Sequence, residues 1–435
     1  MAATSISLLS LSPNLPTTLS SPSLSLPISR TTNFKIVSCL SIKQPHDPKT
    51  IPSQNDAVVS LRVAFAGGGT GGHIYPAVAI ADELKRTNPT TQILFLGTPD
   101  SMESTAITAA GYAFEPVSAV RLARPVLFSL QNLLLPFRLV KSTLQSFSKL
   151  RDFNPHLVVG TGGYVSFPTC LASVFLKDTK LVIQEQNSVP GVANWVLSHF
   201  SDVVFVAFNS TVDCFPKRTK CVVSGNPVRL SSNYDGSVSK AAAMARFFPR
   251  SRNAGDEEAK VVLVLGGSLG ANAVNIAMLN VYYQMLMENE KLFIIWQTGV
   301  EAFNEMESLV KNHPNLHLTP FMHSMDLAYL AGDLVISRAG AMTCSEILAH
   351  GKPSILIPSP NVAEGHQFKN ASLMADLADA RIIIEDELDS TTLKNSIEEL
   401  LGDEKKMADM SERALKAAKL NASAEIAQHI LSLVD

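Results

Sequence analysis

The sequence predicts an α/β protein with two Rossmann-like, doubly wound domains whose parallel sheets face each other across a cleft. From Leu61 onward, short and nearly continuous runs of Val, Ile and Leu alternate with helical patterns, which is typical of parallel strands covered on both faces. The two halves also open alike, each as strand, glycine turn and helix, in LRVAFAGGGTGGHIYPAVAIADELKR and KVVLVLGGSLGANAVNIAMLNVYYQ. We therefore expect ligands in the crevice beyond the carboxyl ends of the strands.

Changes in composition suggest the domain boundaries. We expect a first domain over residues 58–228 and a linker over 229–258, which includes the charged stretch PRSRNAGDEEAK. A second domain follows over 259–435, and its last helical segments are amphipathic with the 3.6-residue period of an α-helix.

The first 57 residues differ from the rest of the chain. They are rich in Ser, Thr, Leu and Pro, and no acidic residue precedes Asp47. Ser and Pro interrupt every apolar run, which disfavours a secretory signal. This composition favours an organelle transit peptide, plastid rather than mitochondrial because arginine is scarce, and a plain disordered tail is the alternative. No segment reaches about 18 apolar residues, so we expect no membrane span.

The overall composition excludes several classes of function. With 435 residues and 46% hydrophobic content, the chain can bury more than one core. A formal net charge of -3 argues against a nucleic-acid polymer as the main partner. The five cysteines form no CxxC pair and no zinc-type cluster, so we expect reduced thiols and no structural metal.

Two glycine turns are candidate phosphate sites. GGGTGGH at 67–73 fits the dinucleotide pattern, but no acidic residue ends the second strand about 20 positions on, because Asp100 comes late and beyond a proline. A dinucleotide site is therefore a weak prediction there. GGSLGAN at 266–272 is the better diphosphate site, since backbone N–H groups, a helix N-terminus and the Ser268 hydroxyl converge on it. A tight turn that simply needs small residues is the alternative.

Further polar side chains follow other strands at the same sheet edges. In SRAGAMTCSEIL the first helical turns carry Glu346, whose carboxylate could accept two hydrogen bonds from ribose hydroxyls. Its alternative role is favourable charge near a helix N-terminus. In the first half, GTGGYVSFP and QEQNSVPG bring further polar groups to the edge that holds GGGTGGH: Tyr164, Gln184, Glu185 and Asn187.

The segment between Glu115 and Asp152 is basic and apolar. It has no acidic residue, and PVLFSLQNLLLPFRLVKSTLQSF lies among its cations, which are Arg121, Arg124, Arg138, Lys141, Lys149 and Arg151. Such a pattern suits the surface of an anionic membrane or a lipid-phosphate substrate. A buried helix with basic ends explains it equally well.

Taken together, the motifs resemble those of the MurG family of N-acetylglucosaminyltransferases, which make lipid II in peptidoglycan synthesis. GGGTGGHIYPAVAIADEL, GTGGYVSFP, QEQN, SGNPVR, GGSLGAN, SRAGAMTCSE and HQFKNA occur in that family's order, and the resemblance covers 61–435. It implies a GT-B fold with an N-terminal domain for the lipid-linked acceptor and a C-terminal domain for UDP-N-acetylglucosamine (UDP-GlcNAc). It also implies that the last helix crosses back onto the first domain and that no cofactor or metal is needed.

The resemblance assigns roles to individual residues. It implies His73 and Glu185 as catalytic residues, and Tyr164 and Gln184 at the acceptor. It implies a larger set for UDP-GlcNAc, in which Thr70, Gly71 and Gly72 would approach both donor and acceptor: Thr70, Gly71, Gly72, Asn187, Arg229, Ser268, Met322, Ala341, Met342, Thr343, Cys344, Ser345, Glu346 and Gln367. The family commonly has HEQN where this chain has QEQN, so Gln184 replaces a histidine with a side chain that does not titrate.

The implied reaction is an inverting single displacement, in which the acceptor's 4-hydroxyl attacks the anomeric carbon while UDP leaves. His73 is the candidate base because imidazole titrates near physiological pH; a loop-orienting role is its alternative. We expect peripheral association with a plastid membrane on its stromal side, and no nucleic-acid partner. The rival functions are a plastid galactolipid synthase using UDP-galactose and diacylglycerol, a catalytically silent UDP-sugar-binding protein and, more remotely, an NAD- or FAD-dependent oxidoreductase.

Overall fold

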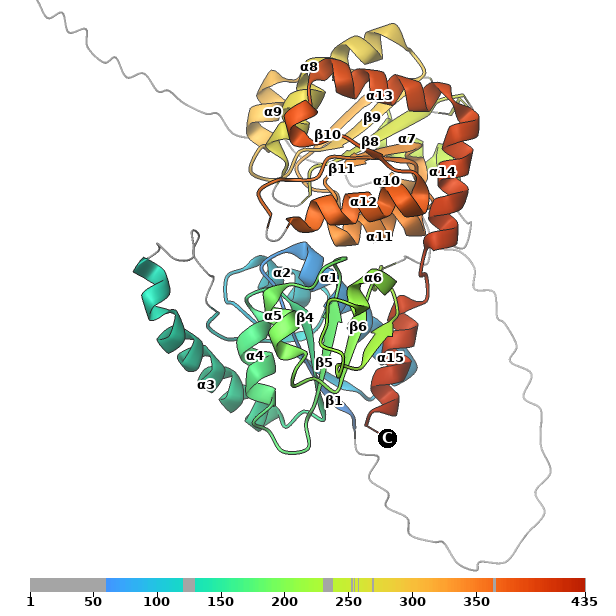
Figure 1. Ribbon diagram of the computed structural model, residues 1–435. Helices are drawn as coiled ribbons and strands as arrows, with labels where there is room; N and C mark the ends of the chain where they lie inside the picture. The colour runs from blue at the N-terminus through green and yellow to red at the C-terminus, as the bar shows by residue number, and fades with distance from the viewer. Residues whose placement is uncertain are drawn as a thin grey trace, which may run out of the picture. The chain divides into compact units, whose positions relative to one another are not determined.

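The computed structural model describes residues 60–119, 130–229, 238–251, 253, 255–256, 258–267, 270–362 and 365–434. The predicted transit peptide, the cations Arg121 and Arg124, and Ser268 lie outside the described residues. The α/β fold with two parallel sheets is confirmed, and Figure 1 shows the helices that pack around each sheet.

The described part of the first domain holds a parallel sheet with the strand order β3-β2-β1-β4-β5-β6-β7. Its strands are β1 (Arg62–Gly67), β2 (Gln92–Gly97), β3 (Ala113–Pro116), β4 (Leu157–Gly162), β5 (Lys180–Glu185), β6 (Val203–Val206) and β7 (Cys221–Val223). Its helices are α1 (Gly71–Thr87), α2 (Met102–Ala109), the 3-10 helix η1 (Leu130–Leu134), α3 (Leu135–Phe153), α4 (Ser166–Ser173), α5 (Val192–Leu197) and α6 (Asn209–Val212).

The described part of the second domain holds a parallel sheet in the order β10-β9-β8-β11-β12-β13. Its strands are β8 (Lys260–Leu265), β9 (Leu292–Gln297), β10 (Leu316–Thr319), β11 (Leu334–Ser337), β12 (Ser354–Leu356) and β13 (Arg381–Ile382). Its helices are α7 (Lys240–Phe247), α8 (Asn272–Glu288), α9 (Phe303–Leu309), α10 (Met325–Ala331), α11 (Ala341–Ala349), α12 (His366–Ala378), the 3-10 helix η4 (Glu385–Glu387), α13 (Ser390–Gly402) and α14 (Glu404–Ala417).

Alternation along the central strands builds an apolar layer on each face of each sheet. In β1, Val63 and Phe65 pack into one core cluster while Ala64 and Ala66 pack into another. β8 divides its residues between two clusters in the same way. This two-residue period of a pleated strand explains why both central strands are apolar throughout.

The strand order reverses between β1 and β4 in the first sheet and between β8 and β11 in the second. Such switch points leave a crevice at the carboxyl ends of the strands because the flanking helices pass to opposite faces. GGGTGGH follows β1, GGSLGAN follows β8, and the SRAGAM turn follows β11. The fold therefore brings all three motifs to crevices.

The region expected to be a linker, 229–258, contains helix α7. Met244 and Phe247 of this helix and the adjacent Phe248 are buried in a core cluster of the second domain. The second domain therefore includes α7, which is a correction to the predicted boundary. The charged composition nearby concealed its apolar face.

The last helix, α15 (Ala422–Ser432), packs against α1 of the first domain. Ile426, Ala427 and Ile430 of α15 are buried in the same cluster as Ile74 and Val78 of α1. The last helix therefore crosses back and packs on the first domain. No described helix combines the length and apolar character needed to cross a bilayer.

Candidate functional site

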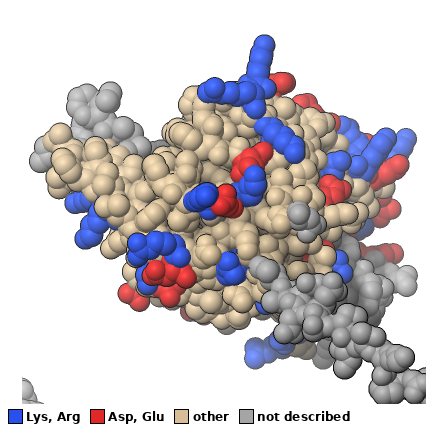
Figure 2. All heavy atoms as spheres, turned by 90° about the horizontal axis from the view of Figure 1, so that it is seen from below, with Lys and Arg blue, Asp and Glu red and all other residues tan. Residues whose placement is uncertain are grey.

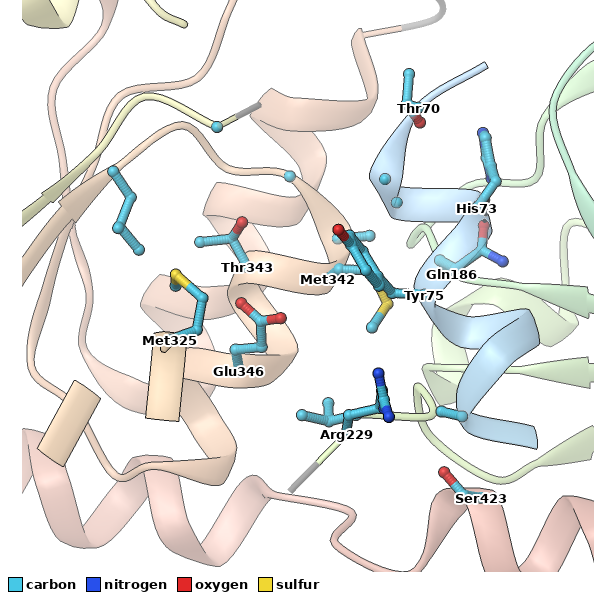
Figure 3. Close-up of a pocket in the computed structure, with 18 of the residues that line it drawn as sticks. Thr70, His73, Tyr75, Gln186, Arg229, Met325, Met342, Thr343, Glu346 and Ser423 are labelled. Atoms are coloured by element: carbon cyan, nitrogen blue, oxygen red, sulfur yellow. Dashed lines mark hydrogen bonds between the residues drawn. The ribbon is translucent and has the colours of Figure 1, made fainter. Parts of the chain in front are cut away.

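A cavity of about 1100 Å³ opens between the carboxyl edges of the two sheets. Many of the predicted site residues line it: Thr70, Gly71, Gly72, His73, Asn187, Arg229, Met322, Ala341, Met342, Thr343, Glu346 and Gln367. Figure 3 shows Thr70 just before α1 and His73 on α1, with Thr343 and Glu346 of α11 on the opposite side of this pocket. Tyr164, Gln184, Glu185, Cys344 and Ser345 are not among its lining residues.

The first glycine turn is held tightly from behind. Gly69 has φ +85°, a left-handed conformation that favours glycine, and a Cβ added there would lie 2.8 Å from Tyr164 Cε1. Tyr164 therefore packs behind the turn rather than lining the cavity, unlike its expected acceptor role. Thr70 is the N-cap of α1, so the first N–H groups of the helix lie at the cavity wall.

His73 has a defined orientation. Its Nδ1 lies 3.0 Å from the carbonyl oxygen of Thr161 and 2.9 Å from Oε1 of Gln186. Both neighbouring oxygens are hydrogen-bond acceptors. The amide of Gln186 is oriented by its Nε2, which donates to the Thr161 carbonyl at 2.7 Å, so its Oε1 faces the imidazole. Nδ1 must then carry the proton, which leaves Nε2 with a free lone pair as the basic nitrogen.

Gln186 belongs to a chain of hydrogen bonds that crosses from the first domain to the second. Its Nε2 also donates to Oε1 of Gln184, and Nε2 of Gln184 donates to Oδ1 of Asn226 at 3.0 Å. Asn226 Nδ2 donates to Oγ of Ser345 on α11 at 2.8 Å. Gln184 is fully buried within this series of hydrogen bonds, so its side chain does not reach the cavity. The expectation that it contacts the acceptor substrate is therefore not met.

Glu185 also differs from its expected catalytic role. Its side chain is buried, and its carboxylate accepts hydrogen bonds from the backbone N–H groups of Asn187 and Gly191 and from the side-chain amides of Asn187 and Asn194. A carboxylate that is saturated with donors and shielded from the cavity is not placed to take a substrate proton. Glu185 instead fixes the loop that carries Asn187.

On the opposite wall, α11 presents one face to the cavity. Met342, Thr343 and Glu346 line it, whereas Cys344 is buried in the core and Ser345 faces Asn226. This division follows from helical geometry, because residues i and i+4 share a face. The expectation that the whole stretch 341–346 meets the donor is therefore too broad for Cys344 and Ser345.

Glu346 is the ionisable group of this wall. Its Oε2 accepts a hydrogen bond of 3.0 Å from the Tyr329 hydroxyl, and burial raises its pKa to about 7. The Tyr329 ring stacks on His350, and burial lowers the pKa of His350 to about 4. A carboxyl group in such surroundings changes protonation near neutral pH.

The second glycine turn and the Met322 loop are joined by Gln297 at the end of β9. Gln297 Nε2 donates to the Gly267 carbonyl at 2.9 Å, and its Oε1 accepts from the Met322 backbone N–H at 3.1 Å. Gly267, Gln297 and Met322 all line the cavity. Gln367 also lines it, and its Oε1 accepts from the Ser359 N–H at 2.8 Å.

Arg229, the expected diphosphate ligand, has a protein partner at the cavity edge. Its Nε lies 3.1 Å from Oδ2 of Asp82 on α1, and Oδ1 of Asp82 accepts from the Tyr112 hydroxyl at 2.7 Å. Both charged side chains are partly exposed, so the ion pair is weak enough for an anion to replace the carboxylate.

Gln186, Gln297 and Asp82 are among the cavity residues that the sequence did not predict. Gln186 lies in QEQN, where the two-residue strand period places it on the face of Gln184, and this was the available signal. Among the described residues, no group of His, Cys, Asp and Glu forms a metal-type cluster.

Known proteins resemble this chain over most of its length. Residues 63–206 match the N-terminal domain and residues 261–430 the C-terminal domain of glycosyltransferase family 28. The chain is 38% identical over 374 residues (86% of this chain and 97% of the relative) to a UDP-N-acetylglucosamine–N-acetylmuramyl-(pentapeptide) pyrophosphoryl-undecaprenol N-acetylglucosamine transferase of Salinibacter ruber. It is 40% identical over 372 residues (85% and 97%) to the Flavobacterium psychrophilum protein of that name. The crystal structure of Acinetobacter baumannii MurG aligns with a TM-score of 0.64 at 27% identity, over 86% of this chain and 99% of that one.

Proposed function

Because this chain belongs to glycosyltransferase family 28, we propose that it transfers N-acetylglucosamine from UDP-GlcNAc to a lipid-pyrophosphate-linked N-acetylmuramyl-peptide. The product is the disaccharide lipid from which peptidoglycan is made. The observation that carries this proposal is the cavity itself, which brings His73 and the GGGTGGH turn opposite Glu346 and the α11 N-terminus.

The chemical step follows from the orientation of His73. The 4-hydroxyl oxygen of the acceptor attacks the anomeric carbon, the bond from that carbon to the UDP oxygen breaks, and the configuration inverts. Nε2 of His73 takes the hydroxyl proton because Nδ1 already holds one against Thr161 and Gln186. UDP leaves with the electron pair of the broken bond.

The diphosphate of the donor lies against the second wall of the cavity, which α11 forms, and beside Arg229. The N-terminus of α11 begins at Ala341 and offers N–H groups to a diphosphate, and Arg229 supplies a cation once Asp82 releases it. Glu346 accepts hydrogen bonds from the ribose hydroxyls when it is ionised. The N-terminus of α11 and Arg229 stabilise the negative charge that builds up on UDP in the transition state.

Transfer from radiolabelled donors tests this function. The full-length protein and a form that begins at residue 58 are incubated with UDP-GlcNAc and a lipid-pyrophosphate-linked N-acetylmuramyl-pentapeptide in detergent. We expect label in the lipid product. Parallel reactions contain UDP-galactose and diacylglycerol. Galactolipid formation without N-acetylglucosamine transfer would contradict the proposal, and inactivity with both pairs would favour a silent sugar-binding protein.

We also propose that η1 and α3 bind a membrane surface. The buried face of α3 carries Ser142 and Ser146, whereas Leu133, Phe137, Val140 and Leu144 are exposed at helical spacing. Phe137 is 75% exposed, and Arg138 and Lys141 are exposed beside this apolar row. A helix that presents its apolar face outward and flanks it with cations suits an anionic bilayer.

Co-sedimentation with vesicles tests the membrane contact. We expect binding to phosphatidylglycerol vesicles that weakens with phosphatidylcholine and with salt. Phe137→Asp together with Leu144→Asp should abolish sedimentation, whereas Phe175→Asp, which changes an exposed apolar residue outside η1 and α3, should not. Equal binding by the wild type and both variants would contradict the proposed membrane contact.

Figure 2 shows basic and acidic side chains interspersed on one face of the molecule, which does not suggest a basic stripe for binding a nucleic acid.

For the location of the enzyme, we propose the plastid stroma, on the basis of the Ser-rich N-terminal region with no acidic residue before Asp47. Residues 1–57 fused to a fluorescent protein should direct it to plastids in plant cells. Fluorescence in mitochondria or in the cytosol would contradict this assignment.

A further inference from the structure

A buried glutamate lies behind the first glycine turn and has no role in the chemistry described above. Glu103 is the second residue of α2 and is only 1% exposed. Burying a carboxyl group is costly unless donors satisfy it. Its Oε1 accepts from the backbone N–H of Thr98 at 3.4 Å and from the Thr98 hydroxyl, and its Oε2 accepts from the backbone N–H of Gly69 at 3.3 Å.

The glycines around Glu103 make room for it. A Cβ added at Gly68 would lie 2.8 Å from Glu103 Cδ, and one added at Gly97 would lie 3.0 Å from Glu103 Cγ. On its other side the turn contacts Tyr164, which is 2.8 Å from the Cβ position of Gly69. The turn therefore packs between the carboxyl group of Glu103 and the aromatic ring of Tyr164.

The turn divides into two halves with different surroundings. Gly68 and Gly69 do not line the cavity, whereas Thr70, Gly71 and Gly72 do. The N–H of Gly69 is already bonded to Glu103, so the first N–H groups of α1 are the ones that face a ligand. Glycine can adopt many backbone conformations, and the hydrogen bond to a fixed carboxyl group holds Gly69 in the one with φ +85°.

We propose that Glu103 is a positioning residue for the lipid-linked acceptor: by holding the Gly69 N–H, it sets the turn that presents Thr70, Gly71 and Gly72 to the acceptor's diphosphate. This inference rests on the proposed function, because it takes the first-domain wall of the cavity as the acceptor side. Glu103 itself touches no substrate and acts through the backbone of the turn.

Glu103→Gln tests the inference selectively. Two donors from Thr98 point at Oε1, so the amide oxygen of glutamine will take that place and its NH₂ group will face the Gly69 N–H. We expect the KM for the acceptor to rise about tenfold and the KM for UDP-GlcNAc to change less than about twofold. Glu103→Asp, which is one methylene shorter, should resemble Glu103→Gln.

Ile107→Ala is the matched control. Ile107 lies on the same helix and is buried in the core cluster against β1, away from the turn. This change should lower the melting temperature and leave both KM values near wild type. Thr98→Val removes only the hydroxyl donor to Glu103; it should raise the acceptor KM about two- to threefold, and it keeps the test available if the Glu103 variants do not fold.

The outcomes separate this inference from the proposed function. If the wild-type protein transfers no N-acetylglucosamine, the proposed function fails. If the wild type is active and Glu103→Gln leaves the acceptor KM unchanged, or raises both KM values equally, only the positioning role fails. An acceptor KM raised as much by Ile107→Ala would reduce Glu103 to a stabiliser of α2 and overturn the inference.

Discussion

The two walls of the cavity use different chemistry. Around His73 the first wall is built from carboxamides: Gln186 accepts from His73 and donates to Gln184, Gln184 donates to Asn226, and Asn226 donates to the hydroxyl of Ser345 on the second wall. Neither the three carboxamides nor the hydroxyl titrates. The second wall places Glu346 beside Tyr329 and His350, and burial shifts the pKa of all three.

This difference separates two tasks. A base needs its proton on a known nitrogen, and neutral amides fix the orientation of His73 without adding a charge that would change with pH. A site for ribose gains from a carboxylate, but a buried carboxylate is costly, so its charge depends on pH and on the ligand. The first wall therefore fixes the orientation of the base, and the second wall carries the pH dependence of donor binding.

Removing the imidazole tests the first wall most severely. His73→Ala should lower kcat by about 10²–10⁴-fold, the usual contribution of a general base, with smaller changes in both KM values. Steady-state transfer assays measure this, and His199→Ala, at an exposed histidine, is the control. A His73→Ala enzyme with near-normal kcat would exclude this residue as the base.

Removing the amide that orients the imidazole should have a smaller effect. Gln186→Leu keeps the approximate volume but takes away the acceptor at Nδ1, while the Thr161 carbonyl remains. We expect kcat to fall about tenfold, corresponding to one hydrogen bond. The exposed Gln284→Leu on α8 should match wild type. A normal kcat for Gln186→Leu would show that the Thr161 carbonyl alone orients His73.

The second wall predicts a pH dependence of donor binding. With its pKa near 7, Glu346 is mostly protonated at pH 6 and mostly ionised at pH 8, so affinity should rise with pH. We expect the Kd for UDP, measured by calorimetry, to fall about tenfold from pH 6 to pH 8, as binding to the ionised form alone requires. Glu346→Gln should bind more weakly and flatten this profile. An unchanged pH profile in that variant would assign the dependence to another group.

The ion pair between Asp82 and Arg229 should give the smallest effect. Asp82→Asn keeps an acceptor for Tyr112 but frees Arg229, so the KM for UDP-GlcNAc should fall by about two- to fivefold, the range of an exposed ion pair. Arg229→Ala should raise it instead. If both variants raise the KM, Asp82 supports Arg229 rather than competing with the diphosphate.

The sequence predicts the backbone of this site better than its side chains. The glycine turns follow β1 and β8 because only strand, turn and helix fit those patterns, and the parallel sheets bring their ends to crevices. Within 341–346 the helical period could have separated Glu346 from Cys344 and Ser345. The direction of the QEQN side chains depends on the register of β5, and the partners of Glu185 come from a loop. The sequence therefore predicted a catalytic role for Glu185, whereas in the structure Gln186 is the residue that contacts His73. Glu103 gave no signal, because the Gly69 N–H and the N–H and hydroxyl of Thr98 converge on its carboxyl group only in the fold.

Which ring nitrogen of His73 carries the proton decides whether Nε2 is available to act as the base. Nitrogen NMR of the unliganded protein with ¹⁵N-labelled histidine, assigned by comparison with His73→Ala, distinguishes the two neutral tautomers. We expect a protonated Nδ1 and an unprotonated Nε2, because Nδ1 faces two hydrogen-bond acceptors. A proton on Nε2 with a bare Nδ1 would contradict it, since the nitrogen proposed to take the acceptor's proton would already be occupied.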